Sequence, residues 1–153
     1  MITDGATNGV IQFTNSATAG NLTVFTNGVG CSRAFPGNHT DFFDTSSAGS
    51  ATFYNNGTDG FSLGNFTSFF DSATADNAVL IANGSTGSGF FFKGETIFND
   101  TSDAGNATLI ANPGSNGGAG GSIEFFTDST VPILAWRFSA MVTWTLAGTT
   151  LRV

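Results

Sequence analysis

The feature that most constrains this chain is an internal repeat of about 28 residues. Four blocks superimpose without gaps, and they read NSATAGN (15–21), DTSSAGS (44–50), DSATADN (71–77) and DTSDAGN (100–106). A fifth, DST (128–130), breaks off, so the blocks begin at 15, 44, 71, 100 and 128, in steps of 29, 27, 29 and 28 residues. A fixed period of this kind is typical of a solenoid, in which each repeat forms one coil and packs on its neighbours.

Composition assigns these coils to β-structure. The chain has 21 Gly and 17 Phe, whereas charged residues make up only 10% of it. The strong helix formers Glu, Lys, Gln and Arg are scarce, while aromatic and β-branched residues favour strands. Parallel crossovers are right-handed, and a coil of this length suits a three-sided helix. We therefore predict an all-β, right-handed parallel β-helix (β-solenoid) of about five coils over residues 1–130.

Columns of like residues should line the inside of these coils. Equivalent residues in stacked coils lie about 4.8 Å apart, so inward phenylalanines would stack along the axis. Small alanines recur where each coil turns tightly, and Asn-Gly pairs follow, in which we expect the glycine to supply positive φ. The predicted structural ladder is Phe13, Phe42, Phe69, Phe98 and Phe126, the alanines are Ala19, Ala48, Ala75 and Ala104, and the pairs include Asn56-Gly57 and Asn83-Gly84.

The strand between the alanine and the Asn-Gly pair alternates between two faces. We expect the inward set to be Leu22, Ala51, Ala78 and Ala107 with Val24, Phe53, Leu80 and Leu109. The outward set, the candidate binding face, is Thr23, Phe25, Thr52, Tyr54, Val79, Ile81, Thr108 and Ile110. Regularly spaced threonines are what an ice-binding or carbohydrate-binding face needs, although threonine is common on any outer β-surface.

Residues 131–153 leave the repeat and are rich in apolar side chains. Alternation between Trp136 and Thr143 predicts β-structure, and Arg137 weakens a membrane-span interpretation. Two interpretations stay open. The segment is a β cap over the last coil, or it is an association segment that joins molecules head to tail, because solenoid ends expose unpaired strands.

Two copies of the repeat carry a family resemblance, FFDTSSAGSATFYNNG (42–57) and FNDTSDAGNATLIANPG (98–114). They resemble repeats of bacterial autotransporter and filamentous-haemagglutinin-like surface proteins, over about residues 10–130. The resemblance implies a right-handed β-helix passenger at the cell surface, often adhesive, and hence an extracellular or cell-surface location. The chain departs from those families because it shows no signal sequence, no translocator barrel and fewer coils.

Side chains suited to chemistry are few. The single histidine, His39, has Asp41 and Asp44 close in sequence, but we expect it to be a solvent-exposed loop residue. The repeated acids are expected to cap turns through their own backbone, since catalytic carboxylate clusters use non-equivalent positions, often with basic partners. These acids are Asp44, Asp71, Asp100 and Asp128.

The net charge limits the classes of molecule that we expect the chain to bind. A formal charge of −7 leaves no basic stripe for nucleic acid or for an anionic membrane, and the apolar tail does not predict membrane insertion. We predict no catalytic site, no cofactor and no metal. The expected function is a non-enzymatic structural or adhesive surface module with a host-surface or carbohydrate ligand. The alternatives are a fibre subunit that associates with its own copies through its coil ends, and an ice- or carbohydrate-binding β-helix that uses Thr23, Thr52 and Thr108.

Overall fold

The computed structural model describes residues 9–28, 37–59, 64–86 and 93–131, together with the backbone of 143–146 and 149–152. Its strands are β1 (Val10–Phe13), β2 (Asn21–Asn27), β3 (His39–Phe42), β4 (Ser50–Asn55), β5 (Phe66–Phe69), β6 (Val79–Ala82), β7 (Glu95–Phe98), β8 (Thr108–Ala111), β9 (Ser122–Phe125), β10 (Thr143–Leu146) and β11 (Thr149–Arg152).

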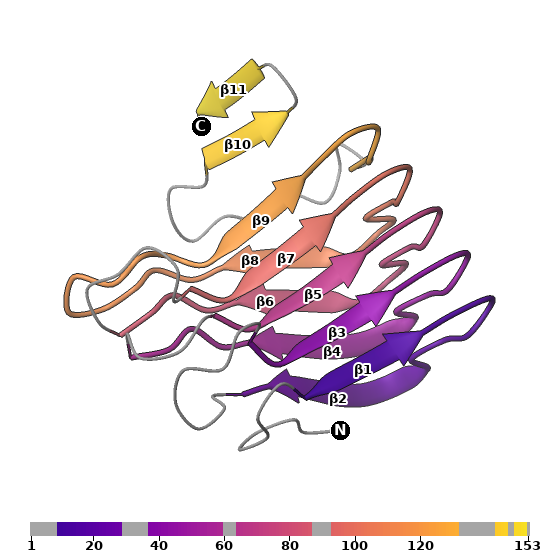
Figure 1. The fold of residues 1–153 in the computed structure, drawn as a ribbon, viewed down its shortest axis with the longest axis horizontal. Helices are drawn as coiled ribbons and strands as arrows, with labels where there is room; N and C mark the ends of the chain where they lie inside the picture. The colour runs from indigo at the N-terminus through magenta and orange to yellow at the C-terminus, as the bar shows by residue number, and fades with distance from the viewer. Residues whose placement is uncertain are drawn as a thin grey trace.

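The strands form a parallel β-solenoid (Figure 1). The odd-numbered strands β1-β3-β5-β7-β9 make a five-stranded parallel sheet, and β2-β4-β6-β8 make a four-stranded one. Single bridges form a third side, which links Thr18, Ser47, Thr74, Asp103 and Thr130 in turn. The chain climbs the stack with the hand of a right-handed screw (Figure 1). The predicted fold is confirmed, with about four coils rather than five.

The core between the sheets is a set of stacked rings and small side chains. Phe42 and Phe69 are fully buried, and their ring centroids lie 4.8 Å apart with an interplanar angle of 7°. Phe53, on the opposite sheet, meets Phe42 edge to face at 5.7 Å, so the two ladders interlock. The predicted alanines Ala19, Ala48, Ala75 and Ala104 are all buried at the turns.

The fifth member of the phenylalanine ladder is Phe125, so the prediction of Phe126 was wrong. Phe125 pairs with Phe98 and stacks on it at 4.6 Å, whereas Phe126 points outward and is 43% exposed. Strand alternation explains this, because Ile123 and Phe125 are the buried positions of β9. The last block therefore begins at Thr127, which shares the left-handed backbone conformation of Asp100, and Asp128 lies outside that column.

In the first coil the predicted directions were also wrong. The register shifts between Asn21 and Val24, as in a β-bulge, so Phe25 rather than Val24 pairs with Phe53. Phe25 is buried, while Leu22 is 94% exposed at φ 58°. A bulge twists this edge strand away from in-register pairing. In the other three coils the predicted inward residues are confirmed as buried: Ala51, Phe53, Ala78, Leu80, Ala107 and Leu109.

In the predicted pairs Asn56-Gly57 and Asn83-Gly84 the glycine does not adopt positive φ, which corrects that expectation. Among the residues that the structure describes, the glycines with positive φ are Gly20, Gly49, Gly105 and Gly117. Gly57 and Gly84 are needed for close approach instead, because a Cβ on Gly57 would overlap the backbone of Gly84, and one on Gly84 would overlap that of Gly114.

Beyond the coils, β10 and β11 form an antiparallel pair, and β10 lies next to β9 at the end of the stack (Figure 1). This arrangement is a C-terminal β element at the position predicted for the cap. The rest of 132–153 lies outside the described residues, so the choice between cap and association segment stays a prediction. Within the described part of the chain, no helix is long and apolar enough to cross a membrane.

Candidate functional site

The outer surface of the four-stranded sheet is an uncharged array, which we call the neutral face. It consists of four columns that run along the solenoid axis, namely Ser50/Asn77/Asn106, Val24/Thr52/Val79/Thr108, Thr26/Tyr54/Ile81/Ile110 and Asn56/Asn83/Asn112. Every one of these side chains is half-buried or exposed. The two central columns are apolar or hydroxyl-bearing, and amides and a serine flank them. Such a surface can offer van der Waals contact and neutral hydrogen bonds.

The amide column of the neutral face is ordered by its own hydrogen bonds. Asn83 Nδ2 donates to Asn56 Oδ1 at 2.8 Å, and Asn112 Nδ2 donates to Asn83 Oδ1 at 2.7 Å. A primary amide carries two N–H groups, so Asn83 and Asn112 each keep a second N–H for another partner. The ladder thus fixes side chains that would otherwise rotate freely.

Most of the predicted binding face lies where the sequence placed it. The six residues that do so are Thr52, Tyr54, Val79, Ile81, Thr108 and Ile110. The two from the first coil were misplaced, because Thr23 lies within the bulge and Phe25 belongs to the core. Val24, which is 49% exposed, and Thr26 occupy the face instead.

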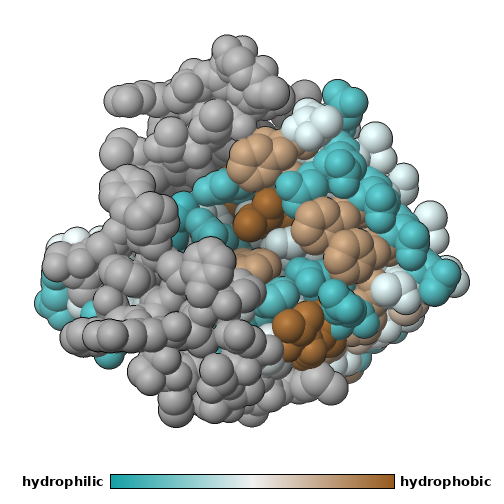
Figure 2. Space-filling model, viewed as in Figure 1, coloured by the Kyte–Doolittle hydropathy of each residue, from teal (hydrophilic) through white to brown (hydrophobic). Residues whose placement is uncertain are grey.

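The outer surface of the five-stranded sheet differs, and we call it the mixed-charge face. Its two columns are Val10/His39/Phe66/Glu95/Ser122 and Gln12/Asp41/Ser68/Ile97/Glu124, with Lys93 beside them. The chain's single histidine, its single lysine and both of its glutamates lie here. Figure 2, which views this side, shows hydrophilic and hydrophobic side chains interleaved on it.

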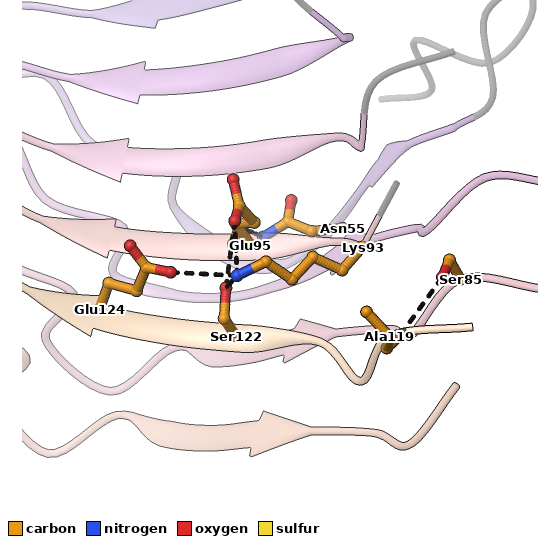
Figure 3. A network of polar contacts seen from close by, with 7 residues as sticks. All are labelled: Asn55, Ser85, Lys93, Glu95, Ala119, Ser122 and Glu124. Atoms are coloured by element: carbon orange, nitrogen blue, oxygen red, sulfur yellow. Dashed lines mark hydrogen bonds and ion pairs between the residues drawn. The ribbon is translucent and has the colours of Figure 1, made fainter. Parts of the chain in front are cut away.

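Lys93 is the centre of a polar cluster on the mixed-charge face (Figure 3). Its Nζ lies 2.9 Å from Glu95 Oε1 and 3.1 Å from Glu124 Oε1, and it donates to Ser122 Oγ at 2.7 Å. Burial alone would lower the pKa of Lys93, but the hydrogen bonds and charges of the two glutamates together outweigh it and raise the pKa. The cluster therefore satisfies its own charges.

His39 is a buried strand residue, so the prediction of an exposed loop histidine was wrong. Its ring stacks on Phe66 with centroids 4.5 Å apart. Nδ1 lies 2.8 Å from the carbonyl oxygen of Gly37, which identifies Nδ1 as the protonated nitrogen, and Nε2 faces Asp41 Oδ2 at 3.5 Å. Burial raises the pKa of Asp41, and His39 and Gln12 partly offset this rise.

Sequence reasoning missed the mixed-charge face, although a signal for it existed. Its members stand one and three residues before a ladder phenylalanine, as His39 and Asp41 do before Phe42. Period-two alternation places such positions outward and side by side. The pattern was easy to overlook because no residue type repeats there from coil to coil.

Aspartates of the turn column act between coils rather than on their own backbone. The Asp44 carboxylate accepts the N–H of Asn15 at 2.8 Å, Asp71 accepts that of Asp44 at 3.0 Å, and Asp100 that of Asp71 at 3.2 Å. Each carboxylate thereby links its own turn to the backbone of the preceding coil. Their role is structural in this geometry, since every bond runs to a neighbouring turn.

Among the residues that the structure describes, no group of three or more His, Cys, Asp or Glu side chains could hold a metal ion. Cys31 lies outside those residues. Comparisons with protein-family models, curated proteins and solved structures return no match to this chain.

Proposed function

We propose that this chain is a non-enzymatic, structural and adhesive β-solenoid module of a surface protein, and that the neutral face is its contact surface. The observation that carries the proposal is that the neutral face is uncharged, ordered and accessible. Tyr54 is 37% exposed at its centre, flanked along the axis by Thr26 and Ile81. An accessible apolar array with hydrogen-bonding borders is typical of an interaction site.

The ladder architecture supports a module that holds its shape under load. Each coil is joined to the next by parallel pairing in both sheets and by turn bonds such as that from Asp44 N to Asp71 Oδ2. Aromatic stacking continues through all five members of the ladder. The resemblance of the repeat to surface-exposed passengers favours an extracellular setting.

Ice binding and fibre assembly receive less support. An ice lattice requires a uniform array, but Val79 interrupts the threonine column and the bulky Tyr54 lies beside it. A fibre built by coil-on-coil stacking requires a regular edge, whereas the bulge at Leu22 distorts the edge of β2. For an enzyme, the carboxylates of Glu95 and Glu124 are both engaged by Lys93.

Bead attachment tests the proposal. Beads that carry the whole chain should adhere to a panel of microbial, plant and animal cell surfaces more than beads that carry albumin. The same preparation should release no reducing ends from polysaccharide substrates. Attachment no better than albumin on every surface, or release of reducing ends that Lys93→Ala abolishes, would contradict the proposal.

A further inference from the structure

We propose that the neutral face binds a neutral polysaccharide, with pyranose rings lying along the column Tyr54, Ile81 and Ile110. The inference rests on the proposed function and specifies the ligand class for that surface. Three features of the neutral face support it. The face is uncharged, its columns place apolar side chains beside hydrogen-bonding ones, and its area suits a single glycan chain.

Lack of charge excludes charged polymers as the best-matched ligand. None of the residues of the neutral face is Asp, Glu, Lys, Arg or His, although the chain as a whole carries a formal charge of −7. A charged ligand would lose hydration on this surface without gaining an opposite charge. A neutral, hydroxyl-rich ligand suffers no such loss.

The order of the columns matches the two kinds of surface on a sugar ring. The central column Tyr54, Ile81 and Ile110 is apolar and can contact the C–H face of a pyranose, with Tyr54 offering an aromatic ring. Thr52 and Thr108 lie on one side of it, and the amide column lies on the other. Neighbouring columns are about 7 Å apart, two residues along a strand, so hydroxyls at the rim of the ring can reach both.

Ordered donors are already present at that rim. Asn83 and Asn112 each use one N–H within the amide ladder and keep one for a ligand. Because the ladder fixes their rotamers, binding need not order them again, and that preorganisation favours affinity. The amide column, which repeats about every 4.8 Å, also offers the same contact to successive sugars, and this favours a polymer over a free monosaccharide.

The area of the face disfavours a second copy of the chain as the occupant. Four strands and seven residues cover about 14 Å by 20 Å, or roughly 300 Å². A stable protein interface buries about 800 Å² on each partner. The face is thus too small for a dimer but is adequate for one extended glycan chain.

The test is a sedimentation assay with insoluble cellulose, chitin and β-1,3-glucan as neutral probes and a polygalacturonate gel as the acidic probe. We expect the wild-type chain to bind at least one neutral probe, with equal affinity in about 50 mM and 1 M NaCl, since no charge takes part. Ile81→Lys should weaken binding at least tenfold. The matched control is Ile97→Lys, a half-buried outward isoleucine of the mixed-charge face, which should bind as wild type does.

Tyr54→Ser is the second variant and should also lose binding. Circular dichroism shows which variants are folded. Failure of every neutral probe, preference for polygalacturonate, salt-sensitive binding, or equal losses in Ile81→Lys and Ile97→Lys would overturn the inference. A dimer that Ile81→Lys dissociates in sedimentation analysis would assign the face to a second copy and would also overturn it. If beads still attach to cells while all neutral probes fail, the adhesive function stands and only the ligand class is wrong.

Discussion

The two outer faces of the solenoid share one core but are built by opposite rules. On the neutral face the columns hold only uncharged side chains, and the amide column repeats its residue type, as Asn83 follows Asn56 and Asn112 follows Asn83. On the mixed-charge face the residue changes at every coil, from His39 to Phe66 to Glu95. Like charges about 4.8 Å apart repel, so a charged side chain suits only a column that does not repeat, or one whose carboxylates each accept a backbone N–H.

This difference divides the work between the faces. The mixed-charge face directs its polar groups at one another, as in the cluster around Lys93, and so contributes to stability. The neutral face leaves donors and apolar surface open, and so is suited to contact. Substitutions on the two faces, and in the core beneath them, should therefore have separable effects.

The largest effect is expected from the core that both faces share. Phe69→Ala should lower the free energy of unfolding by about 3–5 kcal/mol, because it removes a fully buried ring stacked between Phe42 and Phe98. Phe70→Ala is the control, since Phe70 is half-buried and stacks outward on Phe43 at 4.9 Å, and it should cost about 1 kcal/mol. Urea denaturation measures both, and equal costs would show that the inward ladder is not the core.

A neighbouring pair of asparagines should show the next largest difference. The buried Asn55 donates to Glu95 O at 2.8 Å, and its Oδ1 accepts from Asn27 Nδ2 at 2.8 Å and Thr67 Oγ1 at 2.9 Å. Asn55→Ala should cost about 3 kcal/mol, because it leaves those buried groups unpaired. Asn56→Ala, on the neutral face, should cost less than about 1 kcal/mol in the same denaturation experiment. A larger loss for Asn56→Ala than for Asn55→Ala would show that Asn56, and not Asn55, is the buried side chain.

Loss of the lysine tests the mixed-charge face. Lys93→Met should cost about 1–2 kcal/mol at pH 7, since it leaves Glu95 and Glu124 side by side without a cation. The pKa of Lys93 is raised above its ordinary 10.5 in the folded state, so its contribution is complete below about pH 10.5 and is lost as pH rises through the folded-state pKa. Thermal unfolding of both proteins from pH 7 to pH 12 should show the gap closing, and a gap that widens at high pH would contradict this sign.

The smallest effect on stability is expected on the neutral face. Ile81→Lys should change the free energy of unfolding by about 0.5 kcal/mol, because the side chain is only half-buried and its long aliphatic stem is retained. A loss above about 2 kcal/mol in urea denaturation would show that Ile81 is a core residue.

Sequence reasoning recovers what the repeat encodes. Like residues over like residues predicted the coils, the alanine turns and four of the five ladder phenylalanines. It failed where one residue shifts the register. The Phe-Phe pair 125–126 aligns with 42–43 and 69–70, and Phe25-Thr26-Asn27 aligns with Phe53-Tyr54-Asn55, but both alignments need a gap that the regular blocks did not suggest. Strand registry decides such cases because one residue reverses every side-chain direction.

The mixed-charge face could not be predicted from columns of identical residues, because the residue type in its columns changes from coil to coil. His39 and Asp41 meet because they alternate along one strand, and Lys93 meets Glu124 because two coils stack. Burial of His39 beside Phe66 depends on that stacking as well, which local sequence does not reveal.

The most direct test of this division is to measure unfolding free energy and polysaccharide or cell-surface binding side by side for Tyr54→Ser and Lys93→Met. We expect Tyr54→Ser to lose binding while its unfolding free energy stays within about 0.5 kcal/mol of wild type, and Lys93→Met to lose about 1–2 kcal/mol while binding is kept. Binding lost in Lys93→Met at unchanged stability, with Tyr54→Ser binding normally, would show that the roles of the two faces are reversed.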